Sequence, residues 1–100
     1  MYNIIMNGIR FEWDENKNET NKKKHSISFE EASSVFYDTE ALVIPDPDHS
    51  KGEERFLILG YSFCLKLLVV CHCYRENEEI IRIISARKAT KTERKQYEEK

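Results

Sequence analysis

The chain has 100 residues, 40% of them hydrophobic, which is enough for one small domain with a thin core. Its formal net charge of −2 excludes a uniformly basic protein that coats nucleic acid, although the charges are segregated and a local basic site remains compatible. The three cysteines lack the spacing of a secreted disulfide scaffold, and no apolar run is long enough to span a membrane. The first nine residues are too short and too polar for a signal peptide, so we expect a cytoplasmic protein with reduced thiols.

The first predicted elements are a short strand and a polar helix. Phe11-Glu12-Trp13 alternates apolar and polar side chains, as a strand does. Asp14 is then placed to cap a helix over Glu15–Lys24. This helix has almost no apolar stripe, so we expect a solvated face, a binding surface or a marginal helix.

A second helix and a strand follow. The segment Ser28–Glu31 has the pattern of a capping box, and Ile27 and Ala32 on either side fit a hydrophobic staple. The apolar stripe of this helix predicts an end near Tyr37. Ala41–Ile44 is typical of a strand that stops at a proline, and the proline and glycine residues of 45–52 predict a loop.

The second half of the chain is predicted to form a sheet. Arg55–Tyr61, Lys66–Tyr74 and Glu79–Lys88 are typical of strands, and their short connections make them antiparallel neighbours. A capping box that begins at Thr90 then starts a polar C-terminal helix. We therefore expect a single α+β domain over residues 1–100, with a small antiparallel sheet and helices packed on one face.

Side-chain alternation in the middle strand indicates which face is buried. The odd positions of Lys66–Tyr74 are apolar and are expected to meet the helices, so that His72 points away from them. A three-residue loop at Glu76–Glu78 would pair Arg75 with Glu79 and put His72 opposite Arg82, and we favour this register. A loop with an even number of residues would shift the pairing by one residue.

The last strand carries arginines inside an isoleucine run. Arg82 lies between isoleucines of Ile80–Ile84, and Arg87 closes the strand. A guanidinium is seldom buried without a partner, and its planar fork suits carboxylates and phosphates. Two interpretations remain open at this point, an ion pair with a nearby glutamate and the binding of an anion.

Possible metal sites have simpler explanations. Strand alternation points the thiols of Cys71 and Cys73 away from the His72 ring, so the three cannot converge on one ion without a bulge. Asp46, Asp48 and His49 offer too few oxygen ligands for a calcium loop, and carboxylates between prolines are typical of a turn. We therefore expect no metal site and no cofactor.

The motifs taken together resemble the BrnT toxin family. The match begins with Phe11-Glu12-Trp13-Asp14, Lys17, Asn21, Lys24-His25 and Phe29-Glu30-Glu31-Ala32. It continues in order through Asp48-His49, Gly52-Glu53-Glu54-Arg55, Gly60-Tyr61-Ser62, Arg82–Ala89, Glu93 and Tyr97. The resemblance covers 11–98 and leaves the extension 1–10 outside it. The hairpin tip Ser62–Leu65 departs from the family's polar turn and is expected to expose apolar side chains.

The resemblance implies a RelE-like fold and a ribonuclease toxin of a type II toxin–antitoxin pair. It implies RNA as the substrate, cleavage of mRNA without a metal ion, and a ribbon-helix-helix, BrnA-like antitoxin as the partner. RNA cleavage by the substrate 2′-hydroxyl needs a base, an acid and cations that stabilise the phosphate. The matching positions imply a catalytic group of Arg82, Arg87, His25, Glu54 and Arg55, and an RNA-binding group of Lys17, Lys24, His72 and Lys88.

Two other functional classes stay open. One is a non-catalytic module that uses the same arginines to hold an acidic protein. The other is a structural subunit whose arginines pair with its own glutamates. Closed ion pairs at both Arg82 and Arg87 would favour the structural subunit.

Overall fold

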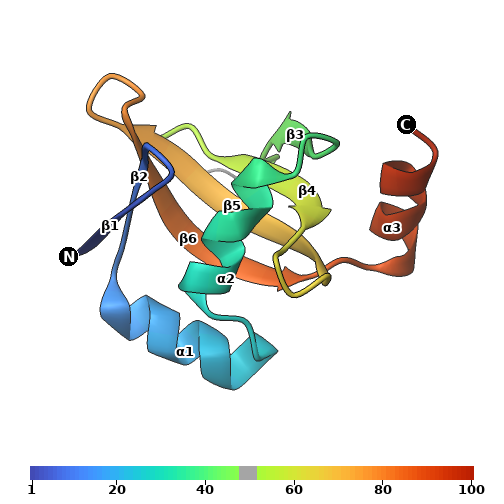
Figure 1. Cartoon of the computed structure of the whole chain (residues 1–100), viewed down its shortest axis with the longest axis horizontal. Helices are drawn as coiled ribbons and strands as arrows, with labels where there is room; N and C mark the ends of the chain where they lie inside the picture. The colour runs from blue at the N-terminus through green and yellow to red at the C-terminus, as the bar shows by residue number, and fades with distance from the viewer. Residues whose placement is uncertain (48–51) are drawn as a thin grey trace.

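A computed structural model describes residues 1–47 and 52–100 of the chain (Figure 1). The elements follow in the order β1 (Tyr2–Met6), β2 (Ile9–Trp13), α1 (Glu15–His25), α2 (Phe29–Ser34), the 3-10 turn η1 (Val35–Tyr37), β3 (Leu42–Pro45), β4 (Phe56–Tyr61), β5 (Leu67–Arg75), β6 (Ile80–Lys88) and α3 (Lys91–Glu98). Every element predicted from the sequence is present, with ends that differ by one or two residues, except that α2 ends at Ser34 and η1 continues to the predicted end at Tyr37. The side chains of Asp14, Ser28 and Thr90 cap the three helices as predicted.

The sheet is mixed, which corrects the prediction of an antiparallel sheet. Within the described residues its six strands lie in the order β1-β2-β6-β5-β4-β3. The three strands with short connections are antiparallel as expected, but β2 pairs in parallel with β6, with Arg10 opposite Ile80 and Glu12 opposite Arg82. A short loop fixes the relative direction only of strands that are consecutive in the sequence. Strands β2 and β6 are separated by most of the chain, so no short loop decides how they pair.

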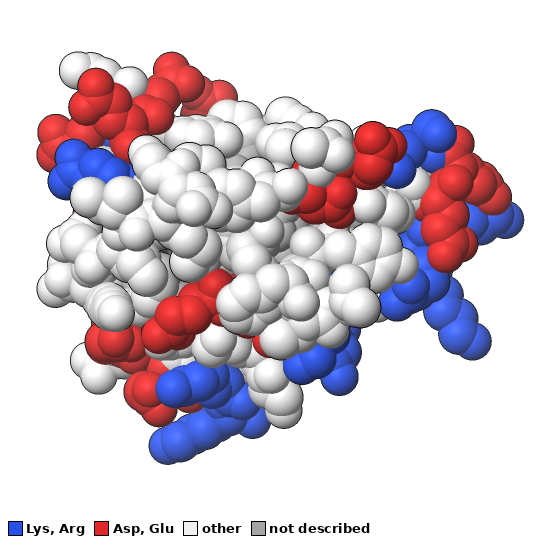
Figure 2. Space-filling model, in the orientation of Figure 1, with Lys and Arg blue, Asp and Glu red and all other residues white. Residues whose placement is uncertain are grey.

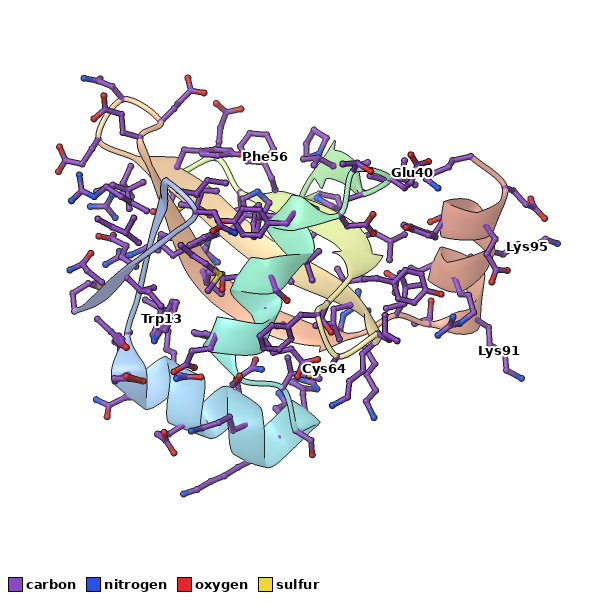
Figure 3. The ribbon with its side chains drawn as sticks, in the orientation of Figure 1. Trp13, Glu40, Phe56, Cys64, Lys91 and Lys95 are labelled. Atoms are coloured by element: carbon purple, nitrogen blue, oxygen red, sulfur yellow. The ribbon has the colours of Figure 1, made fainter. Side chains whose placement is uncertain are left out.

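The N-terminal hairpin was not predicted. Residues 1–10 form β1 and the start of β2, joined by a turn in which Asn7 and Gly8 have φ of 49° and 86°. An Asn-Gly pair is a strong hairpin signal, because both residues accept positive φ at low cost. The Tyr2 ring stacks on the Trp13 ring with centroids 4.9 Å apart, beside the entry to α1 where Figure 3 labels Trp13. The hairpin is therefore part of the folded domain.

Apolar clusters lie on both faces of the sheet. The larger one joins β2, β4, β5 and β6 to α2 and η1 and includes Phe11, Trp13, Phe29, Val35, Leu68, Val70 and Ile83. The smaller one contains Leu59, Leu67, Val69 and Tyr97 of α3. Because Leu67 and Leu68 are neighbours on one strand, the two clusters lie on opposite faces. The prediction that all helices pack on one face is wrong, since the first half of β5 is apolar at odd and even positions and needs cover on both sides.

The register of the last hairpin also differs from the favoured one. Its turn has four residues, so Arg75 pairs with Ile80, Cys73 pairs with Arg82, and His72 pairs with Ile83. The even positions of β5, and not the odd ones, face α2. We attribute this result to burial, because an exposed pair between Arg75 and Glu79 would contribute at most about 1 kcal/mol. Burying one large aliphatic side chain contributes about 1.5–3 kcal/mol.

Helix α1 is held by asparagines in place of an apolar stripe. Its buried residues are Asn18 and Asn21. The Asn18 carboxamide oxygen accepts from the backbone N–H of Phe29 at 2.9 Å, which ties α1 to α2. The Asn21 carboxamide bonds to the backbone of Ala86 in β6 at 2.9 and 3.1 Å. Hydrogen bonds therefore hold α1 beside the sheet, and its lysines are exposed to solvent.

Candidate functional site

A cleft of about 310 Å³ lies between α1 and β6. The helix contributes two lysines, a histidine and three smaller polar side chains, and the strand contributes two residues near its middle. The lining residues are Asn16, Lys17, Thr20, Asn21, Lys24, His25, Ile84 and Ser85. The structure thus brings together three of the predicted site residues, Lys17, Lys24 and His25.

The helix places these cations on one side. Residues three, four and seven positions apart share a helix face, so Lys17, Asn21 and Lys24 lie in line and His25 follows one turn after Asn21. Within residues 1–47 and 52–100, the side chains of Lys17, Lys24 and His25 have no ion pair or hydrogen bond. By contrast, Lys22 on the same helix pairs with Glu19 at 2.8 Å. The cleft therefore holds cationic groups without an internal counter-ion.

A β-bulge shapes the strand side of the cleft. His72 pairs with Ile83 and the preceding Cys71 pairs with Ser85, so Ile84 is an extra residue on β6. A bulge changes the direction of neighbouring side chains, and here both Ile84 and Ser85 line the cleft. Ser85, Thr20 and Asn16 were not predicted as site residues. The helical spacing from Lys17 identifies Thr20 and Asn21 as neighbours, but no signal in the sequence marks the bulge.

The predicted arginines lie elsewhere, on the sheet face that points away from α2, and we call Arg55, Arg82 and Arg87 the arginine face. Arg82 Nε lies 3.1 Å from Glu12, and Arg55 Nε lies 3.1 Å from Glu53. Two N–H groups of Arg87 donate to the two carboxylate oxygens of Glu93 at 2.8 and 2.9 Å. Each of the three guanidinium groups is thus paired with a glutamate of its own chain.

The pair between Arg87 and Glu93 also lowers the pKa of the carboxylate. The hydrogen bond from Arg87, together with bonds from Thr90, lowers the pKa of Glu93 to about 2 in spite of its partial burial. The same glutamate accepts from the backbone N–H of Thr90 at 2.8 Å in the capping box of α3. Arg87 therefore joins the end of β6 to the start of α3. Closed ion pairs at both Arg82 and Arg87 are what the interpretation as a structural subunit predicts.

His72 is buried, which corrects its predicted position on the open face. Its exposed fraction is 0%, and its ring packs against Phe36, Phe56 and Tyr74 with centroids 4.7–6.0 Å apart. Its Nδ1 lies 3.1 Å from the Val70 carbonyl oxygen, and Nε2 has no partner among the described residues. Burial lowers the pKa of His72, so the ring is neutral near pH 7. A side chain in this position does not reach a substrate.

The remaining candidates are dispersed. Glu54 lines a separate cleft of about 790 Å³ beside Phe56, Tyr74 and Arg75. Lys88 is exposed at the end of β6. Figure 2 shows acidic residues gathered at the upper left, over the β5–β6 turn, and basic residues next to acidic ones at the lower left, over α1. Glu54 and His25, both in the predicted catalytic group, thus line different clefts.

No group of three potential metal ligands occurs in the described part of the chain. The thiols of Cys71 and Cys73 lie on the face opposite to His72, as alternation predicted. Burial raises the pKa of Cys71 to about 11, so this thiol stays protonated. Of the proposed loop ligands, Asp48 and His49 lie outside the described residues. Residues 1–47 and 52–100 contain no helix long and apolar enough to cross a membrane.

Comparisons with known proteins identify the family. Residues 13–93 match the family model described as the ribonuclease toxin BrnT of a type II toxin–antitoxin system. A solved structure that resembles the chain is the 1.1 Å crystal structure of the Brucella abortus ribonuclease toxin BrnT, which is 27% identical, has a TM-score of 0.60, and covers 79% of this chain and 94% of its own. No curated protein sequence shows significant similarity. The chain therefore belongs to the BrnT family of ribonuclease toxins from type II toxin–antitoxin systems.

Proposed function

We propose that the chain is a metal-independent endoribonuclease and that the cleft between α1 and β6 is where it holds RNA. The observation that carries this proposal is the convergence of Lys17, Lys24 and His25 in one cleft without an internal counter-ion. Two lysines supply fixed positive charge for a phosphate, and a histidine is the side chain that most readily exchanges protons near neutral pH. A RelE-like fold, implied by the family resemblance, belongs to the same proposal.

The proposed reaction uses the substrate as its own nucleophile. The RNA 2′-hydroxyl attacks the neighbouring phosphorus, His25 takes its proton, and Lys17 and Lys24 stabilise the negative charge that develops on the phosphate oxygens. The bond to the 5′-oxygen of the next nucleotide breaks, the leaving oxygen takes a proton from water and departs as a hydroxyl, and a 2′,3′-cyclic phosphate remains. The hydroxyl and amide groups of Thr20, Ser85 and Asn16 are placed to contact the ribose or a base.

The arginine face has a secondary role in this proposal. Arg82 and Arg87 flank the part of β6 that lines the cleft, and each forms an ion pair with a glutamate of the same chain. Arg82 already forms an ion pair with Glu12, and Arg87 donates to Glu93, so a phosphate would have to compete with these carboxylates. We therefore assign the chemistry to the cleft, and the positioning of β6 and α3 to the arginines.

The decisive experiment is cleavage of a short RNA by the purified chain with and without EDTA, followed by analysis of the new ends. We expect cleavage to persist in EDTA and to leave a 2′,3′-cyclic phosphate or its hydrolysis product. His25→Ala should abolish most of the activity, and His72→Phe is the matched control because His72 is buried in an aromatic cluster. Activity that is lost in EDTA and restored by magnesium or manganese would contradict the proposal.

In a type II system the toxin has an antitoxin partner, and we propose a ribbon-helix-helix protein that covers the cleft with acidic residues. The support is charge, because Lys17 and Lys24, which line the cleft, form no ion pair within the described residues, whereas Lys22 outside it pairs with Glu19. Expression of this chain should stop bacterial growth by cutting mRNA, and co-expression of the antitoxin should restore it. Hydrogen exchange of the complex should protect α1 and the middle of β6. An antitoxin footprint that leaves Lys24 and Ser85 fully exposed would argue against this interface.

A further inference from the structure

Among the described residues, no strand lies beside the second half of β6 on the edge next to the cleft. β2 pairs with β6 only from Ile80 to Arg82, and Trp13 ends β2 one residue later. On that side of the sheet, the chain then turns into α1. Backbone groups of a strand need hydrogen-bond partners when they are buried, so the segment after the bulge requires a substitute for the missing strand.

Asn21 supplies that substitute. Its Nδ2 donates to the Ala86 carbonyl oxygen at 2.9 Å, and its Oδ1 accepts from the Ala86 N–H at 3.1 Å. The carboxamide has the same donor and acceptor groups as a peptide unit, so it pairs with Ala86 as a neighbouring strand would. The same Nδ2 donates to the Ile27 carbonyl oxygen at 2.9 Å, which fixes the chain just after α1. Asn21 is only 6% exposed, so these bonds are shielded from water.

The position of Asn21 connects the two walls of the cleft. On α1 it lies four residues after Lys17, three before Lys24 and four before His25. On β6 its partner Ala86 directly follows Ser85 and the bulged Ile84. The buried residues of α1 are Asn18 and Asn21, so no buried apolar side chain fixes this helix to β6. The spacing between the cations and the strand therefore depends on one carboxamide.

We propose that Asn21 is a positioning residue of the ribonuclease, which holds Lys17, Lys24 and His25 at working distance from Ser85. This inference rests on the proposed function of the cleft. A displacement of about 1 Å between reacting groups can reduce a rate roughly a hundredfold, while RNA binding by cations on a still-folded helix changes less. Loss of the carboxamide should therefore lower kcat more than it raises KM.

Asn18 provides a matched control. It is 1% exposed and also anchors α1, but it does so at α2, through the backbone N–H of Phe29, and it does not line the cleft. Asn21→Ser and Asn18→Ser each shorten a buried asparagine of the same helix. A merely structural role predicts that both variants lose thermal stability and activity in parallel.

The test measures kcat, KM and melting temperature for the full chain and both variants, at a temperature where all are folded. We expect Asn21→Ser to lower kcat roughly tenfold to a hundredfold with KM changed about threefold or less, and Asn18→Ser to leave kcat within about twofold. Amide exchange at Ala86 should be slow in the full chain and in Asn18→Ser, and fast in Asn21→Ser. If Asn21→Ser does not fold, Asn21→Asp, which keeps the shape and loses both donated bonds, takes its place.

The possible failures are distinguishable. Equal losses of kcat in the two variants, or unchanged kcat in Asn21→Ser with fast exchange at Ala86, would overturn the positioning role alone. A full chain without ribonuclease activity, or one that His25→Ala leaves fully active, would overturn the proposed function and this inference with it.

Discussion

The cleft between α1 and β6 and the arginine face both present basic side chains, and they differ in what those side chains contact. In the cleft, Lys17, Lys24 and His25 have no partner among the described residues. On the arginine face, Arg55, Arg82 and Arg87 each meet a glutamate within 3.1 Å. The difference shows that positive charge in a sequence does not by itself indicate an anion-binding site, because internal carboxylates can satisfy it.

The two regions also differ in what a substitution would leave behind. Removal of a cleft lysine leaves no uncompensated charge in the protein. Removal of Arg87 leaves Glu93 half-buried without its main partner, and this costs stability. The cleft and the arginine face can therefore be separated by comparing activity with stability in the same variants.

The largest effect is expected for His25→Ala. If His25 is the base, cleavage should fall roughly a hundredfold to ten-thousandfold with little change in melting temperature, because the residue is the last of a solvent-facing helix. Single-turnover cleavage rates and thermal melts of the wild type and the variant measure both quantities. A His72→Phe variant with the same loss would contradict the assignment.

Lysine substitutions should have the next largest effect. Lys17→Ala and Lys24→Ala should each weaken RNA binding and reduce the salt dependence of the affinity by about 0.7 in the log–log slope, which corresponds to one phosphate contact on a single strand. Lys23→Ala is the matched control, because Lys23 is exposed on the same helix and does not line the cleft. Titration of a labelled RNA at several salt concentrations measures the slope. Equal slopes for all three variants would place RNA binding elsewhere.

Arg87→Ala is expected to act mainly on stability. We expect a loss of about 1 kcal/mol in the free energy of unfolding at pH 7, near the upper limit for exposed pairs, because the contact is bidentate but half-exposed. The folded pKa of Glu93 is about 2, below its unfolded value, so the stabilisation is present above about pH 4.5 and is lost as the pH falls toward 2.

The pH dependence sharpens this prediction. In Arg87→Ala the drop in stability between about pH 4.5 and 2 should be smaller than in the wild type, because less depression of the Glu93 pKa remains to be lost. Urea unfolding at several pH values measures it, with Glu93→Gln as the partner in a double-mutant cycle. Cleavage abolished by Arg87→Ala at unchanged stability would instead assign the arginine face to the active site.

The smallest effect on cleavage is expected for Tyr97→Phe. The Tyr97 hydroxyl donates to Asp38 at 2.7 Å and is the buried polar anchor of α3. Burial, together with the Asp38 carboxylate, raises the pKa of Tyr97 to about 12, so the hydroxyl keeps its proton throughout the physiological range. Loss of one such bond should cost about 1 kcal/mol or slightly more, and cleavage should not change. Reduced cleavage in Tyr97→Phe would show that α3 contributes to the site.

The sequence by itself determined the local elements. The caps at Asp14, Ser28 and Thr90 depend on side chains that bond to backbone groups two or three residues away, so their pattern is readable without the fold. The ends of strands β2 to β6 were predicted within one or two residues, although β1 and its turn were missed and the length of the last turn was wrong. The family was also recognisable, because its motifs keep a fixed order along the chain.

Only the tertiary structure decided which charged groups are available. The glutamates that pair with Arg82 and Arg87 come from a strand distant in sequence and from a helix after a turn. The direction of His72 depended on a four-residue turn and a bulge, and burial of the apolar positions of distant strands decided between the possible registers. The role of Asn21 required β2 to end before β6, which leaves backbone groups that a side chain can satisfy. These features arise from contacts between distant segments, and a pattern of neighbouring residues does not encode them.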